Sequence, residues 1–153
     1  MLELEVVGVR VESPSNQPLV LLRETQGARS LPIWIGPVEA SIIAQTCEGR
    51  TFGRPQTHDL MVAIIEALTD ELLEVRITGV SEGVFVAELL FASGARVDAR
   101  PSDAIVLSLK TGVRIWCEEQ VMENEGLVTL PDEEVEVLKF REFLDEVEPE
   151  DFD

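Results

Sequence analysis

The sequence predicts an α+β domain, in which a mixed β-sheet built of two β-β-β-α half-repeats carries helices packed on it. Three observations predict this class. Apolar and polar residues alternate along several segments, which is typical of strands. Two other segments begin with proline and carry apolar residues at helical spacing. The same order of segments recurs at an offset of 64 residues, which places Pro37 on Pro101 and Glu39 on Asp103.

The first half-repeat is expected to hold three strands and a helix. Its strands are predicted over residues 2–11, 17–24 and 29–35. The alternation slips once near Gly8, where a β-bulge fits. A helix over residues 37–48 follows, and Gly49 ends it. Some matches between two such halves are expected by chance, but the collinear run favours a duplication.

A linking helix over residues 57–68 and a second half-repeat complete the predicted domain. Thr57 is expected to cap the linking helix. Its apolar face is predicted to comprise Leu60, Met61, Ile64, Ile65 and Leu68. The further predicted strands are residues 72–80, 84–91, 95–99 and 113–117. A helix over residues 101–109 is expected to close at Gly112, and an acidic helix is predicted over residues 131–147.

Charge is concentrated at the C-terminal end. The chain has 12 Lys/Arg and 30 Asp/Glu residues, which give a net charge of −18. Residues 118–153 hold only 2 of the Lys/Arg residues but 15 of the Asp/Glu residues. We therefore expect a domain over residues 1–125 and an acidic helical tail over residues 126–153. Such a tail suits a basic protein partner. The absence of a dense basic stripe argues against tight non-specific binding of nucleic acid.

The remaining composition predicts a cytoplasmic protein without a membrane span. The alternating N-terminus is unlike a signal peptide, and no apolar run reaches the ~18 residues that a spanning helix needs. Cys47 and Cys117 match no metal-binding spacing. Buried, reduced thiols are the favoured interpretation, and a single disulfide stays open.

Three polar motifs lie where strands give way to helices, at residues 31–40, 54–60 and 98–105. With Phe85-Val86-Ala87, they resemble the bifunctional nuclease domain family over about residues 3–125; that family often has tyrosine at the middle position of the triplet. The most specific motifs are Thr-His-Asp-Leu (residues 57–60) and Arg-Pro-Ser-Asp-Ala (residues 100–104). The resemblance implies a mixed-sheet α+β fold, a homo-oligomer, and nuclease activity on DNA and RNA.

Carboxylates near these motifs have two interpretations. Glu39 and Asp103 each occupy the third position of a proline-opened helix, where a carboxylate stabilises the helix dipole by ~0.3–1 kcal/mol. This structural role is favoured for each residue alone. The functional interpretation makes Glu39, Asp98 and Asp103 ligands of Mg²⁺ or Mn²⁺, because phosphodiester hydrolysis commonly uses such ions. Asp98 is expected to face inward and pair with Arg100, and we favour this pair over ligation.

His58, the only histidine, lies at a helix start beside Asp59. A histidine is a general base near neutral pH, and a carboxylate can orient it. A purely structural helix-capping segment is about as well supported. The candidate catalytic residues are His58, Asp59, Arg100 and Asp103, and the candidate substrate-binding residues are Arg54 and Ser102. For Trp34 and Trp116, core packing is favoured over base stacking.

The leading functional prediction is a metal-assisted nuclease acting on DNA or RNA, in a cleft where the three motifs converge. The alternative is a non-catalytic regulatory or protein-binding module whose acidic tail contacts a basic partner. A small phosphorylated metabolite is a third possible ligand, because the arginines are few.

Overall fold

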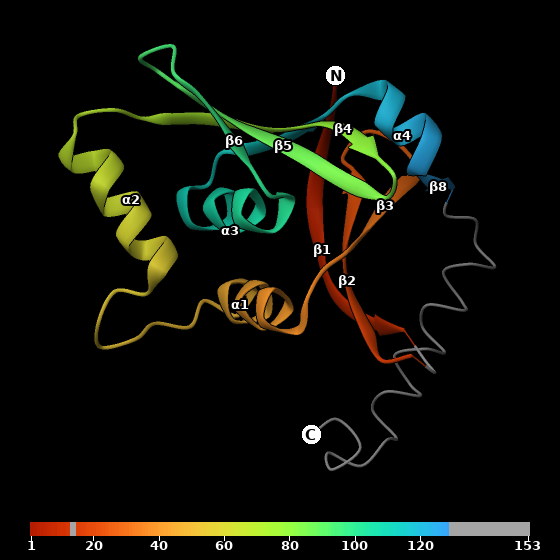
Figure 1. Cartoon of the computed structure of the whole chain (residues 1–153), viewed down its shortest axis with the longest axis horizontal. Helices are drawn as coiled ribbons and strands as arrows, with labels where there is room; N and C mark the ends of the chain where they lie inside the picture. The colour runs from red at the N-terminus through yellow and green to blue at the C-terminus, as the bar shows by residue number, and fades with distance from the viewer. Residues whose placement is uncertain (13–14, 129–153) are drawn as a thin grey trace.

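A computed structural model describes residues 1–12 and 15–128. The predicted acidic helix over residues 131–147 lies outside the described residues. The described part contains one mixed sheet with strand order β6-β5-β4-β7-β1-β2-β3-β8, and helices packed on it (Figure 1). This confirms the predicted α+β class. The strands are β1 (Leu2–Glu12), β2 (Gln17–Glu24), β3 (Arg29–Trp34), β4 (Leu72–Ser81), β5 (Val84–Phe91), β6 (Arg96–Ala99), β7 (Arg114–Cys117) and β8 (Leu127–Val128). The helices are α1 (Pro37–Cys47), α2 (Thr57–Ala67), α3 (Pro101–Thr111) and α4 (Glu119–Glu125).

The two predicted half-repeats are present. In the first, β1, β2 and β3 pair antiparallel in sequence order and α1 follows. In the second, β4, β5 and β6 do the same and α3 follows. The short strand β7 joins the halves, because it pairs parallel to β4 and antiparallel to β1. One continuous sheet therefore runs through both halves.

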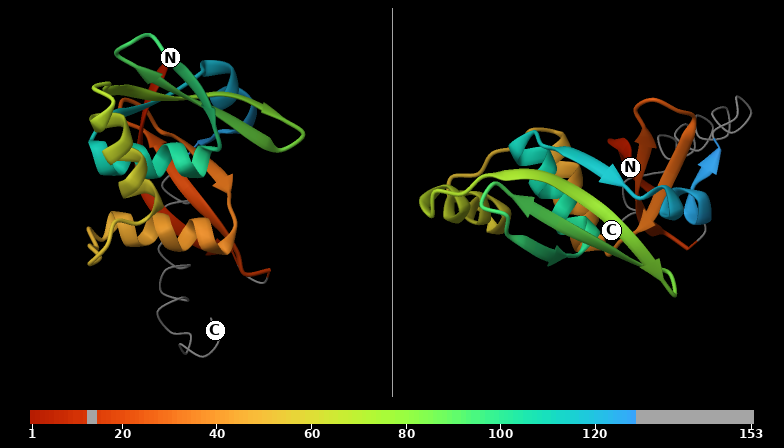
Figure 2. Two further views of the ribbon diagram at one scale, coloured as in Figure 1. Left: turned by 60° about the vertical axis from the view of Figure 1, so that its left-hand side comes forward. Right: turned by 90° about the horizontal axis from the view of Figure 1, so that it is seen from above.

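The two repeat helices, α1 and α3, contact each other and lie side by side (Figures 1 and 2). Ile43 of α1 and Ile105 and Val106 of α3 join one apolar cluster with residues of the sheet. Both helices begin at a proline, whose fixed backbone angle suits the first helical position. The packing thus sets the two helix starts near one another.

Two glycines have the structural roles that the sequence predicted. The pairing of β1 with β2 shifts between Val6 and Gly8, and Gly8 has φ +146°. This confirms the predicted bulge. Gly112 ends α3 in the left-handed conformation, at φ +80°, and its N–H donates to the Ser108 carbonyl at 2.8 Å.

Helix α2 differs from its prediction at its start. Gln56, not Thr57, is the capping residue. The carboxylate of Asp59, the third helical residue, accepts a hydrogen bond from the Gln56 N–H at 3.0 Å. The helix is therefore capped one residue before the predicted Thr57.

The apolar face of α2 is also only partly covered. Met61 and Val62 pack against buried residues of the second half. Leu60, Ile64 and Leu68 are exposed, and Leu68 is the most exposed at 74%. The predicted helix is present, but part of its apolar face stays uncovered, because α2 lies at the side of the molecule and its main contact is with α3 (Figure 1).

The C-terminal part of the described chain holds two elements that the sequence did not predict. Helix α4 buries Val121 and Met122 in the core. Strand β8 pairs with β3, so the sheet extends past the predicted domain boundary at residue 125. No helix within the described residues is long and apolar enough to cross a membrane.

Both cysteines are free thiols. Cys117 is buried, as expected, and burial raises its pKa to about 11. Cys47 is exposed, because it lies at the last residue of α1, so the expectation of a buried thiol is wrong there.

Candidate functional site

A cleft of about 210 Å³ opens where the N-terminal ends of α1, α2 and α3 meet. Apolar residues of α1 and α3, Ile42 and Val106 among them, form part of its wall. The polar residues that line it are Glu39, Thr57, His58, Arg100, Ser102 and Asp103. Segments far apart in the sequence are thus brought together, as the predicted cleft requires.

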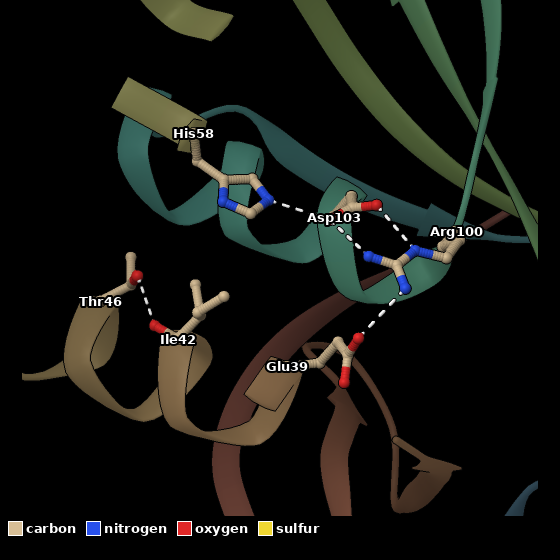
Figure 3. A network of polar contacts seen from close by, with 6 residues as sticks. All are labelled: Glu39, Ile42, Thr46, His58, Arg100 and Asp103. Atoms are coloured by element: carbon tan, nitrogen blue, oxygen red, sulfur yellow. Dashed lines mark hydrogen bonds and ion pairs between the residues drawn. The ribbon is translucent and has the colours of Figure 1, made fainter. Parts of the chain in front are cut away.

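His58 and Asp103 form a hydrogen-bonded pair between α2 and α3. The His58 Nε2 lies 2.9 Å from Asp103 Oδ1 (Figure 3). His58 is only 7% exposed, although it stands at the second position of α2. Sequence neighbours on a helix do not face each other, so the carboxylate that orients His58 comes from α3 rather than from Asp59.

Arg100 binds the carboxylates of both repeat helices. Its Nε and Nη2 donate to Asp103 at 2.9 and 3.3 Å, and its Nη1 donates to Glu39 Oε1 at 3.1 Å (Figure 3). The repeat offset pairs Glu39 with Asp103 but pairs Arg100 with Gly36. One arginine therefore serves two equivalent acidic positions, and only the second half supplies it.

The electrostatics of this network keep Asp103 ionised. Burial on its own raises the pKa of Asp103, but hydrogen bonds from Arg100 and His58 and the charge of Arg100 outweigh it and hold that pKa below its usual range. The Asp103 carboxylate raises the pKa of Arg100 in turn, with a smaller contribution from Glu39. The side chain of Arg100 remains 64% exposed, so its free face is open to an anion.

Three of the predicted site residues lie outside this cleft. Asp59 points to Lys110, whose Nζ lies 2.7 Å from Asp59 Oδ1, and Lys110 is the main cause of a lowered pKa of Asp59. Arg54 is exposed in the loop before α2. Asp98 is exposed on β6, where it lies opposite Glu88, so the expected inward orientation and the pair with Arg100 are wrong. Ala99 packs against the core, and strand alternation directs Asp98 to the other face.

The donor set at the cleft suits a hard divalent cation only in part. Among the described residues, no group of three or more His, Cys, Asp and Glu side chains is placed to hold a metal ion. Glu39 and Asp103 nevertheless converge on one guanidinium. Two carboxylates match Mg²⁺, which keeps several water ligands and commonly takes one or two carboxylates.

A second hollow, of about 390 Å³, adjoins the first. It is lined by the end of β3 with Trp34, by the start of β5 with Val84 and Phe85, and by the start of α3. Trp34 is 49% exposed, so the prediction that it packs in the core is wrong. Strand alternation was the overlooked indication, because Leu31 and Ile33 are buried and Trp34 falls on the opposite face.

Comparisons with known proteins agree with the motifs. A model of the bifunctional nuclease domain matches residues 20–129. An uncharacterized protein of Mycobacterium tuberculosis strain H37Rv is 49% identical over 160 aligned residues, which cover 98% of this chain and 97% of the relative. A protein of strain CDC 1551 of the same species, also described as uncharacterized, matches with the same identity and coverage.

Proposed function

Because the chain belongs to the bifunctional nuclease domain family, we propose that it hydrolyses phosphodiester bonds of DNA or RNA in the cleft at the helix starts. One observation carries this proposal: the single histidine of the chain lies in that cleft, 2.9 Å from a carboxylate that is itself held by an arginine. This arrangement matches a general base with its orienting group.

His58 is the proposed base. In neutral imidazole one ring nitrogen is a donor and the other an acceptor. When Nε2–H donates to Asp103, Nδ1 keeps its lone pair and can take a proton from an attacking water. Asp103 fixes the ring and stabilises the imidazolium that forms.

Arg100 is the residue proposed to bind the substrate phosphate. Its exposed guanidinium can donate to phosphoryl oxygens and stabilise the negative charge that grows on them. Ser102, which lines both hollows, can donate a hydroxyl hydrogen bond to the same phosphate. Both roles need substrate to compete with Glu39 and Asp103 for the guanidinium, so we expect moderate affinity and a strong dependence on salt.

Glu39 and Asp103 would hold a divalent cation, Mg²⁺ or Mn²⁺, if one takes part. Such an ion would supply Lewis-acid stabilisation of the phosphoryl oxygens. Asp98 is dropped from the proposed ligand set because it lies outside the cleft.

The test is cleavage of labelled single-stranded DNA and RNA by the whole chain in Mg²⁺, Mn²⁺ or a chelator. We expect His58→Ala to lower the rate by roughly 10²–10⁴-fold, the usual contribution of a positioned acid–base group. Asp103→Asn should also lower the rate, and Asp70→Asn is its matched control, because Asp70 is also hydrogen-bonded but binds Ser93 and does not line the cleft. Equal cleavage by the His58→Ala protein and the unaltered chain would rule out the assignment.

One observation favours a non-catalytic binding module instead. The cleft residues satisfy one another and tie α1, α2 and α3 together, which a purely structural network would also do. In that case the His58→Ala variant would be less stable than the unaltered chain, and neither protein would cleave nucleic acid. Capture of a basic protein that depends on residues 129–153 would support this alternative and the proposed role of the acidic tail.

We also propose that the chain forms a homo-oligomer through α2. Leu60, Ile64 and Leu68 recur every fourth residue and are exposed together, which is unusual for a helix of an isolated domain. Light scattering of the Ile64→Glu variant tests this, since a charge at the centre of an apolar contact should favour the monomer. An unchanged mass would exclude this face as the contact.

A further inference from the structure

The exposed indole of Trp34 borders the proposed catalytic cleft. Trp34 ends β3, and the chain turns into α1 three residues later. Its strand neighbour Ile33 is 2% exposed, whereas Trp34 is 49% exposed. A large aromatic side chain half in water is costly to leave uncovered, and aromatic residues are enriched where proteins bind other molecules.

The hollow beside Trp34 has the dimensions and lining of a ligand site. Its volume, about 390 Å³, falls within the ~300–1,000 Å³ typical of such sites. The start of β5 supplies Val84, which is 66% exposed, and Phe85. Residues 33–36 of the first half-repeat and residues 83–85 of the second line the hollow, so both half-repeats contribute to its wall.

The Trp34 hollow and the His58 cleft are neighbours. Both are lined by Glu39, Arg100 and Ser102. The exposed guanidinium of Arg100 therefore stands between an apolar aromatic surface and the His58–Asp103 pair. A ligand that matches this order has a flat apolar group for Trp34, then an anion for Arg100, and then the bond to be cleaved beside the His58–Asp103 pair.

We propose that Trp34 stacks against an unpaired base of a single-stranded nucleic acid, whose adjacent phosphate lies at Arg100. The proposal rests on the proposed function, and it specifies the substrate class. A base in a duplex has both faces covered by its neighbours, so it cannot stack on Trp34 without leaving the helix. Every base can stack on an aromatic ring, so the site would distinguish single strands from duplexes but would not prefer a particular base sequence.

The chain allows a direct measurement, because Trp34 and Trp116 are its only tryptophans and it has no tyrosine. In the Trp116→Phe variant, the fluorescence of Trp34 is observed alone. A twelve-nucleotide oligothymidylate is titrated in chelator at low salt, with a blunt-ended duplex at equal phosphate concentration as the comparison. We expect the single strand to quench Trp34 and the duplex to leave its emission nearly unchanged.

Variants of Trp34 then measure the contribution of stacking, by the anisotropy of a labelled oligothymidylate. Trp34→Leu should weaken binding about 5- to 150-fold, the range expected for loss of one stacked base, and Trp34→Phe should restore most of it. Leu73→Ala is the control for loss of an exposed apolar side chain, because Leu73 is 52% exposed and lines neither hollow.

The outcomes separate this inference from the nuclease assignment. Quenching by the single strand with no cleavage in any metal would support the stacking site and contradict the proposed reaction. Cleavage with equal binding by Trp34→Leu and the unaltered chain would overturn the stacking site alone. Emission that shifts to shorter wavelength as protein concentration rises, without nucleic acid, would overturn it too, because a second copy would then cover Trp34.

Discussion

Replacement of Asp103 by asparagine should lower stability by a moderate and measurable amount. The change keeps the shape of the side chain but removes its charge, and with it the charge-assisted bond to the nearly buried His58. Hydrogen bonds to charged groups contribute ~1.5–3 kcal/mol. The asparagine carbonyl can still accept one bond, and Arg100 is exposed, so we expect a loss at or below the lower end of that range, about 1–2 kcal/mol.

Urea unfolding followed by circular dichroism measures this loss. With a slope of ~1–3 kcal/mol/M, the midpoint at pH 7 should fall by roughly 1 M. Glu5→Gln is the control, because it breaks the exposed pair with Arg23 on another part of the surface and should shift the midpoint little.

The difference between the Asp103→Asn variant and the unaltered chain should also depend on pH. The folded-state pKa of Asp103 is lowered, so its stabilising contribution is complete above the ordinary value of ~3.9 and is lost as pH falls through the lowered value. The two midpoints should therefore converge at the acidic end. Identical midpoints at pH 7 would refute the His58–Asp103 bond, and an unfolded variant would show that the bond is essential to the fold.

Three further predictions concern residues outside the cleft. Lys110 lowers the pKa of Asp59, so ionised Asp59 stabilises the fold at neutral pH and this stabilisation is lost as the pH falls through that pKa. In the Lys110→Met variant the stability should therefore decrease less on acidification, as an acid titration followed by circular dichroism would show. A thiol reagent at pH 8 should modify Cys47 but not buried Cys117, whose pKa is about 11, until denaturant is added. Gly112→Ala should lower the free energy of unfolding by about 1–2 kcal/mol, measured by thermal unfolding, because Gly112 has φ +80° and the left-handed conformation is strained for alanine.

Alternation and helix-start patterns were sufficient to predict the sheet and the two repeat helices. Proline at positions 37 and 101 marked both helix starts, and the slip at Gly8 marked the bulge. The elements missed, α4 and β8, are seven and two residues long, too short for a periodic pattern to show.

The cleft was harder to predict than the fold. Asp59 and Asp103 both occupy the third position of a helix, and local sequence does not tell which one faces His58. The choice depends on how α2 packs against α3, which places Asp103 within 2.9 Å of the imidazole and directs Asp59 to Lys110. Only the packing of the helices, which depends on contacts distant in sequence, separates a site residue from a capping residue.

The central place of β7 has a consequence for synthesis on the ribosome. This strand, at Arg114–Cys117, is made after both half-repeats, yet it lies between β1 and β4. Until it emerges, each nascent half exposes an unpaired strand edge, of the kind that pairs readily with other chains. The two halves of the sheet can join only when these four residues insert, so a ribosome that pauses before residue 114 holds a chain that is prone to aggregate and has no completed sheet.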